Sequence, residues 1–216
     1  MRGRQIAGWM IVSVLLAAAR VSGAQTPDAA ATTTPPAPAT PPAPATVMVK
    51  LETSLGPIVL QIETERAPLT AANFLRYVDN KRLDGTEFYR AMIIGDDAEL
   101  GLVQGGLRGN SRRVFKPIAH EPTTLTGLSH VSGAVSMARA EPGTATADFF
   151  IVLGDFSALD ARPEDPGYAV FGHLAAGMDV VRAIMAQPRV EQAQVEVMKG
   201  QMLATPVKII SARRVP

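Results

Sequence analysis

The chain contains no cysteine and only three histidines among its 216 residues. Without cysteine it can form neither disulfides nor thiolate metal sites, and it lacks the residue that anchors bacterial lipoproteins. The histidines, His120, His130 and His173, are not spaced as metal ligands are. We therefore expect no metal site, and the chemistry of the protein has to depend on other side chains.

A strong excess of charge of one sign is also absent. The net charge is +1, and three of the cations, Arg2, Arg4 and Arg20, lie in the first 24 residues, which carry no acid. Removing those three leaves the rest of the chain at −2, so a nucleic-acid-binding surface is not expected. Hydrophobic residues make up 47% of the chain, which is long enough for one domain with a substantial core.

The apolar run near the N-terminus is too short to span a membrane. It extends from Ile6 to Ala19, fourteen residues, whereas a spanning helix needs about 20. Together with Arg2, Arg4 and the small residues at 22–24, the run predicts a signal peptide over residues 1–24 that is cleaved after Ala24. The alternative is an uncleaved membrane anchor. Cleavage predicts a periplasmic or secreted protein with no membrane span.

Residues 25–46 form a stretch of low complexity. They hold seven of the 17 prolines, and most of the others are alanine and threonine. Such a composition cannot bury enough apolar surface to offset chain entropy, so we predict a disordered linker. A docking site for a proline-binding partner is the alternative. The remaining residues, 47–216, are then the folded domain.

From Val47 onward, short apolar runs alternate with glycine and proline. Helices are predicted from Leu69 to about Tyr77, after Pro68, and from near Gly177. Many short strands with two separate helices favour a mainly β fold, a closed barrel capped by helices. The predicted strands are 47–52, 58–63, 87–92, 101–104, 133–139, 149–153, 169–174 and 207–213.

Two segments carry the candidate chemistry, Phe88-Tyr89-Arg90 and Gln104-Gly105-Gly106. Arg90 is a permanent cation with a rigid fork of donors, and Gln104 offers an amide where glycines permit close approach of another backbone. A solvated arginine and a polar strand end are the structural alternatives. The pair suits a reaction that needs a polarised carbonyl and a held peptide without covalent chemistry, such as rotation about an X–Pro bond.

Two further motifs limit the choice of chemistry. Ser136 lies in a predicted strand without the pattern of a nucleophile elbow, so we do not expect it to act as a nucleophile. Phe149 and Phe150 are consecutive strand residues, so one packs in the core and the other can line a pocket.

The ordered series of these motifs resembles the cyclophilin family of peptidyl-prolyl isomerases, especially its exported bacterial branch, over residues 47–216. No single motif is specific, but their order and spacing are. The matching segments are Pro68 with Asn73-Phe74, Phe88-Tyr89-Arg90, Gln104-Gly105-Gly106, Ser136-Met137-Ala138-Arg139, Phe149-Phe150-Ile151, Leu159-Asp160, Gly167 to Gly172 and Gly177 to Val181.

The resemblance implies an eight-stranded antiparallel barrel closed by two helices, with the substrate groove on its outer wall. It implies that Arg90 is catalytic and that Gln104 holds the substrate backbone. It also implies a monomer without a cofactor, whose partners are unfolded or partly folded proteins that contain proline. The residues that match the groove and the proline pocket are Leu102, Ala138, Arg139, Phe150, Leu159 and Tyr168.

Three departures distinguish this chain from the family pattern. Arg90 and Gln104 are fourteen positions apart where eight are usual, because of an insert at 91–100 with an acidic tip. Gly101 and Ala158 stand where pocket aromatics are expected, and Asp148 replaces a glutamine. These changes predict a shallower, more acidic pocket with lower catalytic efficiency. They also leave open a non-catalytic chaperone or envelope adaptor on the same barrel.

Overall fold

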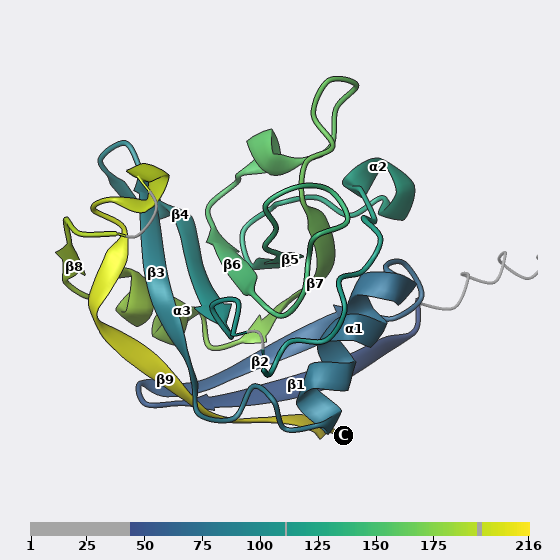
Figure 1. Ribbon diagram of the computed structural model, residues 1–216, viewed down its shortest axis with the longest axis horizontal. Coiled ribbons are helices and arrows are strands. Elements are labelled where there is room, and N and C mark those ends of the chain that lie inside the picture. The colour runs from purple at the N-terminus through teal and green to yellow at the C-terminus, as the bar shows by residue number, and fades with distance from the viewer. Residues whose placement is uncertain (1–43, 111, 194–195) are drawn as a thin grey trace, which may run out of the picture. The chain divides into compact units, whose positions relative to one another are not determined.

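The computed structural model describes residues 44–110, 112–193 and 196–216. The predicted signal peptide and residues 25–43 of the predicted linker lie outside this part of the chain. Nine strands and three α-helices make up the described elements, together with two short 3₁₀ helices (Figure 1). No helix among them has the length and apolar character needed to cross a membrane.

Eight antiparallel strands close into a barrel, as predicted. Their order around the wall is β1-β2-β7-β5-β6-β4-β3-β9, and the pairing of β1 with β9 closes the ring. These strands are β1 Thr46–Thr53, β2 Gly56–Glu63, β3 Thr86–Ile94, β4 Asp97–Gly106, β5 Ala134–Met137, β6 Phe149–Leu153, β7 Ala169–Ala176 and β9 Met202–Val215.

The two predicted helices are present, and a third was not predicted. Helix α1, Pro68–Asp79, begins at a proline and packs against β2, β7 and β9. Helix α3, Met178–Met185, packs against β2, β3 and β4 and follows Gly177 at φ 95°. A Cβ at Gly177 would lie 2.6 Å from the carbonyl oxygen of Pro57, so the start of α3 requires glycine. The additional helix, α2, is the single turn Thr123–Thr126.

Side chains fill the barrel interior. Phe74 of α1 lies with its ring centroid 5.3 Å from that of Phe149 and 5.1 Å from that of Phe171. Phe88 meets Phe149 edge-on at 5.7 Å. Such offset aromatic pairs add to the free energy gained by burial. Because the interior is packed, a binding site has to lie on the outside of the wall.

Two predicted boundaries need correction. Strand β1 begins at Thr46, and Ala45 already exchanges hydrogen bonds with Glu65, so the folded domain starts before residue 47. The predicted strands on either side of the insert at 91–100 are too short, because β3 continues to Ile94 and β4 begins at Asp97. The insert therefore lengthens a hairpin, and only its turn separates the strands.

Gly101 explains why an aromatic is missing from this hairpin. It lies opposite Ile93, beside a register shift, at φ 155°. A Cβ at this position would overlap the backbone oxygen of Met92. No side chain fits there, so the expected pocket phenylalanine cannot be accommodated at position 101.

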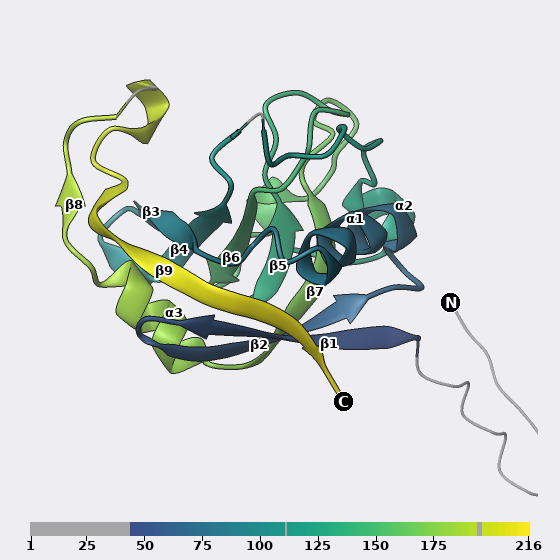
Figure 2. The ribbon, with the colours of Figure 1, turned by 60° about the horizontal axis from the view of Figure 1, so that its bottom comes forward.

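The chain between α3 and β9 leaves the barrel wall and forms an excursion, residues 187–201, of which 194 and 195 are not described. It contains the two-residue strand β8, Arg189–Val190, and the 3₁₀ helix η2, Glu196–Met198. Strand β8 pairs with Leu203 and Met202 at the start of β9. Figure 2 shows the excursion beyond the N-terminal start of β9, away from the β1–β2 side of the barrel.

Candidate active site

A β-bulge in β3 brings Tyr89 and Arg90 to the outside of the barrel together. Phe88 is opposite Gly105 and Arg90 is opposite Gln104, so Tyr89 is an extra residue without a partner in β4. In a regular strand, Phe88 and Arg90 would point to the same face. Phe88 is completely buried in the core, and the extra residue turns Arg90 outward instead. The bulge thus positions the candidate catalytic side chain.

The guanidinium of Arg90 is held by uncharged acceptors. Its Nη1 donates to Oε1 of Gln104 at 2.8 Å, and its Nε and Nη2 donate to Oε1 of Gln201 at 2.8 and 2.6 Å. Nη2 also lies 3.4 Å from Sδ of Met92. Burial lowers the pKa of Arg90, but an arginine remains a cation in proteins. The predicted pair, Arg90 and Gln104, is therefore in direct contact.

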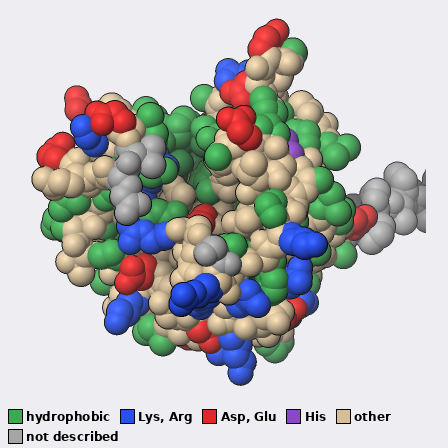
Figure 3. All heavy atoms as spheres, viewed as in Figure 1, with side chains coloured by type: hydrophobic (Ala, Val, Ile, Leu, Met, Phe, Trp, Pro, Cys, Tyr) green, Lys and Arg blue, Asp and Glu red, His purple; other side chains and the backbone are tan. Residues whose placement is uncertain are grey.

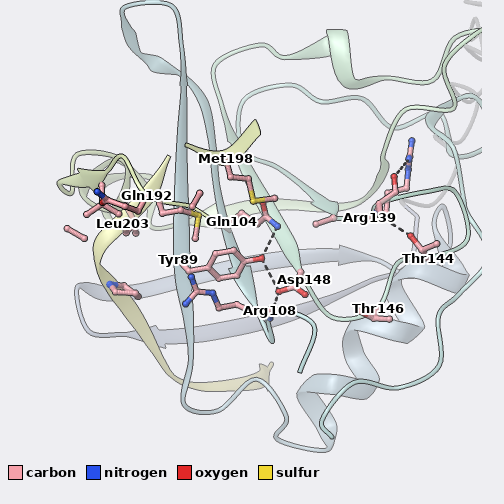
Figure 4. A pocket seen from close by; sticks show the side chains of 17 residues that line it. Tyr89, Gln104, Arg108, Arg139, Thr144, Thr146, Asp148, Gln192, Met198 and Leu203 are labelled. Carbon is pink, nitrogen blue, oxygen red and sulfur yellow. Dashed lines mark hydrogen bonds between the residues drawn. The ribbon is translucent and has the colours of Figure 1, made fainter. Parts of the chain in front are cut away.

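Gln104 continues a chain of hydrogen bonds away from Arg90. Its Nε2 donates to the hydroxyl oxygen of Tyr89 at 2.9 Å, and that hydroxyl donates to Oδ1 of Asp148 at 3.1 Å (Figure 4). Burial, followed by the negative charge of Asp148, raises the pKa of Tyr89, so the phenol stays protonated. The amide of Gln104 is thereby oriented at both ends.

Asp148 is the last member of this series of hydrogen bonds. Its carboxylate accepts hydrogen bonds from the backbone N–H groups of Arg108 and Gly109, at 2.8 and 3.3 Å, in addition to that from Tyr89. Burial raises the pKa of Asp148, although these hydrogen bonds oppose the shift. The predicted acidity is therefore not in the apolar pocket, because Asp148 lies beside Tyr89 and is occupied by three donors.

Next to Gln104, the outer wall carries a second apolar cluster, separate from the core. We call it the outer cluster. Gln104 is opposite Phe150 on β6, and Phe150 is in turn opposite Ser136 on β5. Phe149 packs in the core and Phe150 in the outer cluster. The buried members are Leu102, Ala134, Phe150, Val152 and Val170, and Met92, Leu128, Ala138, Phe156, Leu159 and Tyr168 pack against them.

The outer cluster brings together most of the side chains predicted for the proline pocket. Leu102 and Phe150 are among its buried members, and Ala138, Leu159 and Tyr168 pack on it. The ring of Tyr168 meets that of Phe150 edge-on, with centroids 5.6 Å apart. Phe150 thus forms the base of the cluster, and Tyr168 stands at its side.

Sequence reasoning missed six members of the outer cluster, and two of these, Met92 and Phe156, lie close to positions where pocket aromatics were expected. Met92 is opposite Leu102 in the lengthened hairpin and touches Arg90, and it supplies apolar surface where Gly101 cannot. Phe156 packs on the cluster two positions before the exposed Ala158. The alternation of strand residues 90, 92 and 94 was the available signal for Met92.

Arg139 lies at the edge of the outer cluster. Its guanidinium carbon is 4.8 Å from the ring centroid of Tyr168, and it donates to the backbone oxygens of Gly167 and Ala140. These contacts tie the segment after β5 to the loop before β7. In the structure, the predicted groove residue Arg139 thus holds Tyr168 and its loop in place.

A Ser-His-Asp arrangement lies beneath the outer cluster. Nδ1 of His130 is 2.6 Å from Oδ1 of Asp160, and its Nε2 is 2.9 Å from Oγ of Ser136. Ser136 and His130 are both completely buried, so no substrate can reach this hydroxyl. The ring of His130 stacks on that of Phe150 with centroids 5.9 Å apart. The arrangement supports Phe150, and the rejection of Ser136 as a nucleophile agrees with its burial.

On the other side of Gln104 there is a cavity of about 1100 Å³. Tyr89, Gln104 and Asp148 line it together with Met198 of the excursion and Leu203 of β9 (Figure 4). Figure 3 shows the surface hollowed next to the excursion. Of the predicted groove residues, Ala138 and Arg139 also line this cavity. The groove thus has the outer cluster on one side and a cavity of mixed polar and apolar lining on the other, and Gln104 lies between them.

The described part of the chain has no cluster of side chains that could hold a metal ion. Within residues 44–110, 112–193 and 196–216, no three or more histidine, aspartate or glutamate side chains are grouped to hold one. What the site presents is a fixed cation, an oriented amide and an apolar surface. Such a set can bind a peptide and stabilise charge, but it cannot form a covalent intermediate.

Comparison with known proteins agrees with this geometry. The family model described as cyclophilin type peptidyl-prolyl cis-trans isomerase/CLD matches residues 48–214. A peptidyl-prolyl cis-trans isomerase of Acinetobacter baylyi is 36% identical over 169 residues, covering 77% of this chain and 84% of the relative. Peptidyl-prolyl cis-trans isomerase B of Escherichia coli is 35% identical over 145 residues, covering 63% and 83%.

A solved structure shares the fold. The cyclophilin type isomerase of Cryptosporidium parvum, crystallised in the presence of the dipeptide Ala-Pro, aligns with a TM-score of 0.63 at 19% identity. The alignment covers 78% of this chain and 99% of that one. At this identity the likeness supports the barrel alone.

Proposed function

This chain belongs to the cyclophilin-type peptidyl-prolyl cis-trans isomerase family, and from that membership we propose that its groove acts on X–Pro bonds of exported proteins during folding. The chain is an enzyme of this type by its family. What the geometry adds is a role for each side chain. The observation that carries the proposal is the contact between the cation Arg90 and Gln104 at the border of the outer cluster.

The reaction needs a stabilised twisted state and no bond cleavage. Rotation about the peptide bond has a barrier of about 18–20 kcal/mol, because the planar amide is stabilised by resonance. Uncatalysed X–Pro exchange takes tens to hundreds of seconds, which can limit folding. An enzyme accelerates it by binding the twisted amide more tightly than the planar one.

Arg90 is placed to make that difference. In the twisted amide, resonance is lost and a lone pair localises on the prolyl nitrogen. A guanidinium already fixed by Gln104 and Gln201 donates to this peptide unit without having to reorganise. Partial burial increases its electrostatic effect, because water screens the charge less. Arg90 therefore stabilises the transition state more than the ground state.

Gln104 and the outer cluster hold the substrate for this step. The amide of Gln104 contacts the peptide backbone, while Leu102, Phe150, Leu159 and Tyr168 seat the proline ring on their apolar surface. A seated ring lets the preceding residue turn relative to it. No proton transfer and no cofactor enter the mechanism.

The proposed export of the protein rests on its N-terminal sequence. Arg2 and Arg4, the apolar run from Ile6 to Ala19 and the small residues at 22–24 have the features of a cleaved secretory signal. We propose that the mature protein acts as a monomer in the periplasm or outside the cell. Its substrates there are unfolded or partly folded proteins that contain proline.

The test is prolyl exchange in an Ala-Pro peptide, measured by NMR with the purified protein and with its Arg90→Ala variant. We expect acceleration by the wild type and its loss, by about 100-fold or more, in the variant. Circular dichroism of both proteins controls for folding. Binding of the peptide without acceleration by the folded wild type would instead favour the non-catalytic adaptor.

A further inference from the structure

The excursion contributes one polar side chain to the catalytic arginine, that of Gln201. Oε1 of Gln201 accepts from both Nε and Nη2 of Arg90, at 2.8 and 2.6 Å. This is the edge of the guanidinium opposite the one bonded to Gln104, whose Oε1 accepts from Nη1. Gln104 and Gln201, which are 14 and 111 positions away in the chain, thus hold the Arg90 side chain from two sides.

Gln201 is itself fixed by three hydrogen bonds. Its backbone oxygen accepts from the N–H of Ala91 at 2.9 Å, and its backbone N–H donates to the oxygen of Met198 at 3.1 Å. Its Nε2 donates to the oxygen of Val197 at 3.0 Å. Because the NH₂ group is bonded to η2, the carbonyl oxygen of the side chain has to point towards Arg90.

From this geometry we propose that Gln201 is a positioning residue for the isomerase reaction: it orients the guanidinium of Arg90 and leaves its charge available to the substrate. The proposal rests on the proposed function of Arg90. It assigns a role to the excursion, which none of the family motifs in the sequence covers.

The neutrality of the acceptor matters as much as its position. All four contacts of the Arg90 side chain are made to uncharged atoms, the amide oxygens of Gln104 and Gln201 and the sulfur of Met92. Within the described ranges, no carboxylate forms an ion pair with Arg90. A carboxylate at position 201 would form a strong bidentate pair and partly neutralise the cation. An amide holds the same two donors without this loss.

The number of N–H donors on the guanidinium also supports a positioning role for Gln201. Arginine has five N–H groups. Two are bonded to Gln201, one to Gln104 and one faces Met92, which leaves one on Nη1 for a substrate without breaking a contact. Without Gln201 the side chain could rotate about its last bonds, and that free N–H would no longer keep one direction. Misplacement of a catalytic group by about 1 Å can cost about 100-fold in rate.

The experiment compares Gln201→Met, Gln201→Glu and the wild type by exchange NMR over a range of Ala-Pro peptide concentrations. We expect Gln201→Met, which keeps the length of the side chain but removes the acceptor, to lower kcat about 10-fold with little change in KM. Gln201→Glu keeps both contacts but adds a charge, and it should lower kcat as well. Glutamate also loses the N–H that donates to Val197, so the controls below have to separate the effect of the added charge from that of a loosened excursion.

Two controls separate the possible causes. Gln187→Met makes the same change in the same excursion, at a side chain that contacts Ala183 and not Arg90, and it should keep wild-type kcat. In an Arg90→Ala background, Gln201→Met should have no further effect on the rate, because the two residues act through one interaction.

A direct measurement does not depend on turnover. The Nε–H resonance of Arg90 should be protected and narrow in the wild type and exchange faster with water in Gln201→Met. If Gln201→Met is only marginally stable, Gln201→Asn replaces it, with a side chain too short to reach Arg90. Wild-type kcat together with an unchanged Arg90 resonance in the variant would overturn the inference. An inactive wild type with a protected resonance would overturn the proposed function instead.

Discussion

The two parts of the groove are built in different ways. The outer cluster stands on β4, β5, β6 and β7, and each of these strands is paired on both sides within the closed barrel. The opposite wall of the cavity is formed in part by the excursion, which joins the sheet through the two residues of β8 and through single backbone hydrogen bonds at Pro188 and Gln201. One part is thus held by continuous strand pairing, and the other by a few local hydrogen bonds.

Because of this difference, the surface that binds proline can stay the same while the shape of the rest of the groove changes. A side chain on a doubly paired strand has little freedom, so Phe150 and Leu102 can keep one arrangement under many conditions. The excursion can change in sequence and length without altering the barrel. Arg90 lies where the two parts meet, since Gln104 holds it from the barrel and Gln201 from the excursion.

The largest expected effect is a difference in stability between two variants, each of which truncates one side chain in one part of the groove. Phe150→Ala removes a ring that is almost completely buried and stacked on His130, so the free energy of unfolding should fall by about 3–5 kcal/mol. Met198→Ala in η2 should lower it by less than about 1 kcal/mol, because Met198 is only partly buried. Urea unfolding at neutral pH measures both. Equal losses in the two variants would show that the excursion is as strongly coupled to the fold as the outer cluster.

The next largest effect is on the catalytic rate, through Arg90, which lies where the two parts of the groove meet. Arg90→Lys keeps the charge but loses the planar fork, and an ammonium cannot reach the oxygens of Gln104 and Gln201 in the same way. We expect kcat/KM in the exchange assay to fall by about 100-fold while the circular dichroism spectrum stays unchanged. Full activity in Arg90→Lys would mean that charge alone is sufficient and that the orientation of the fork is not used.

The smallest effect is a difference in pH dependence between the two parts. Burial lowers the pKa of His130 beneath the outer cluster, so below about pH 6.5 the unfolded state takes up the proton first and the free energy of unfolding falls. Burial raises the pKa of Asp148 at the cavity, so as the pH falls through that pKa the folded state takes up the proton first and the free energy of unfolding rises. The two groups therefore act in opposite directions on acidification.

Urea unfolding checks these signs, for the wild type and His130→Gln at about pH 7.5 and about pH 5, and for the wild type and Asp148→Asn from about pH 7.5 down to about pH 4. His130→Gln should lose less stability over its range than the wild type, and Asp148→Asn should lose more over its range. If His130→Gln kept the full loss, another group would be responsible for the acid sensitivity of the protein.

The barrel and part of the outer cluster were predictable from the sequence. Short strands bounded by glycine and proline predicted the eight-stranded wall, and the motifs around Arg90, Gln104 and Phe150 predicted which residues would meet. These residues lie on neighbouring strands, where the register brings them together. Local pattern and family resemblance were sufficient for this part.

The rest depends on contacts that no local pattern encodes. The bulge at Tyr89 follows from packing Phe88 inside while Arg90 points outward, and Gln201 meets Arg90 across 111 positions. Asp148 was expected to make the proline pocket acidic, but it lies beside Tyr89 instead. Its carboxylate is held there by the backbone N–H groups of Arg108 and Gly109 and by the hydroxyl of Tyr89. The role of Met92 likewise depends on the extension of the hairpin. The acidic residues near its tip gave no sign in the sequence that the strands continue so far.

The closure of the barrel by β1 and β9 has a consequence for engineering. Met48 is paired with Val215, so the first and last strands of the domain end side by side on one seam. A short peptide could join them, and the chain could be opened instead at the exposed turn around Gly95 and Asp96, since β3 and β4 each keep a second partner in β9 and β6. Such a circular permutant would have its new ends at the tip of the hairpin that carries Met92, next to the groove, where a client or a fused domain could be attached.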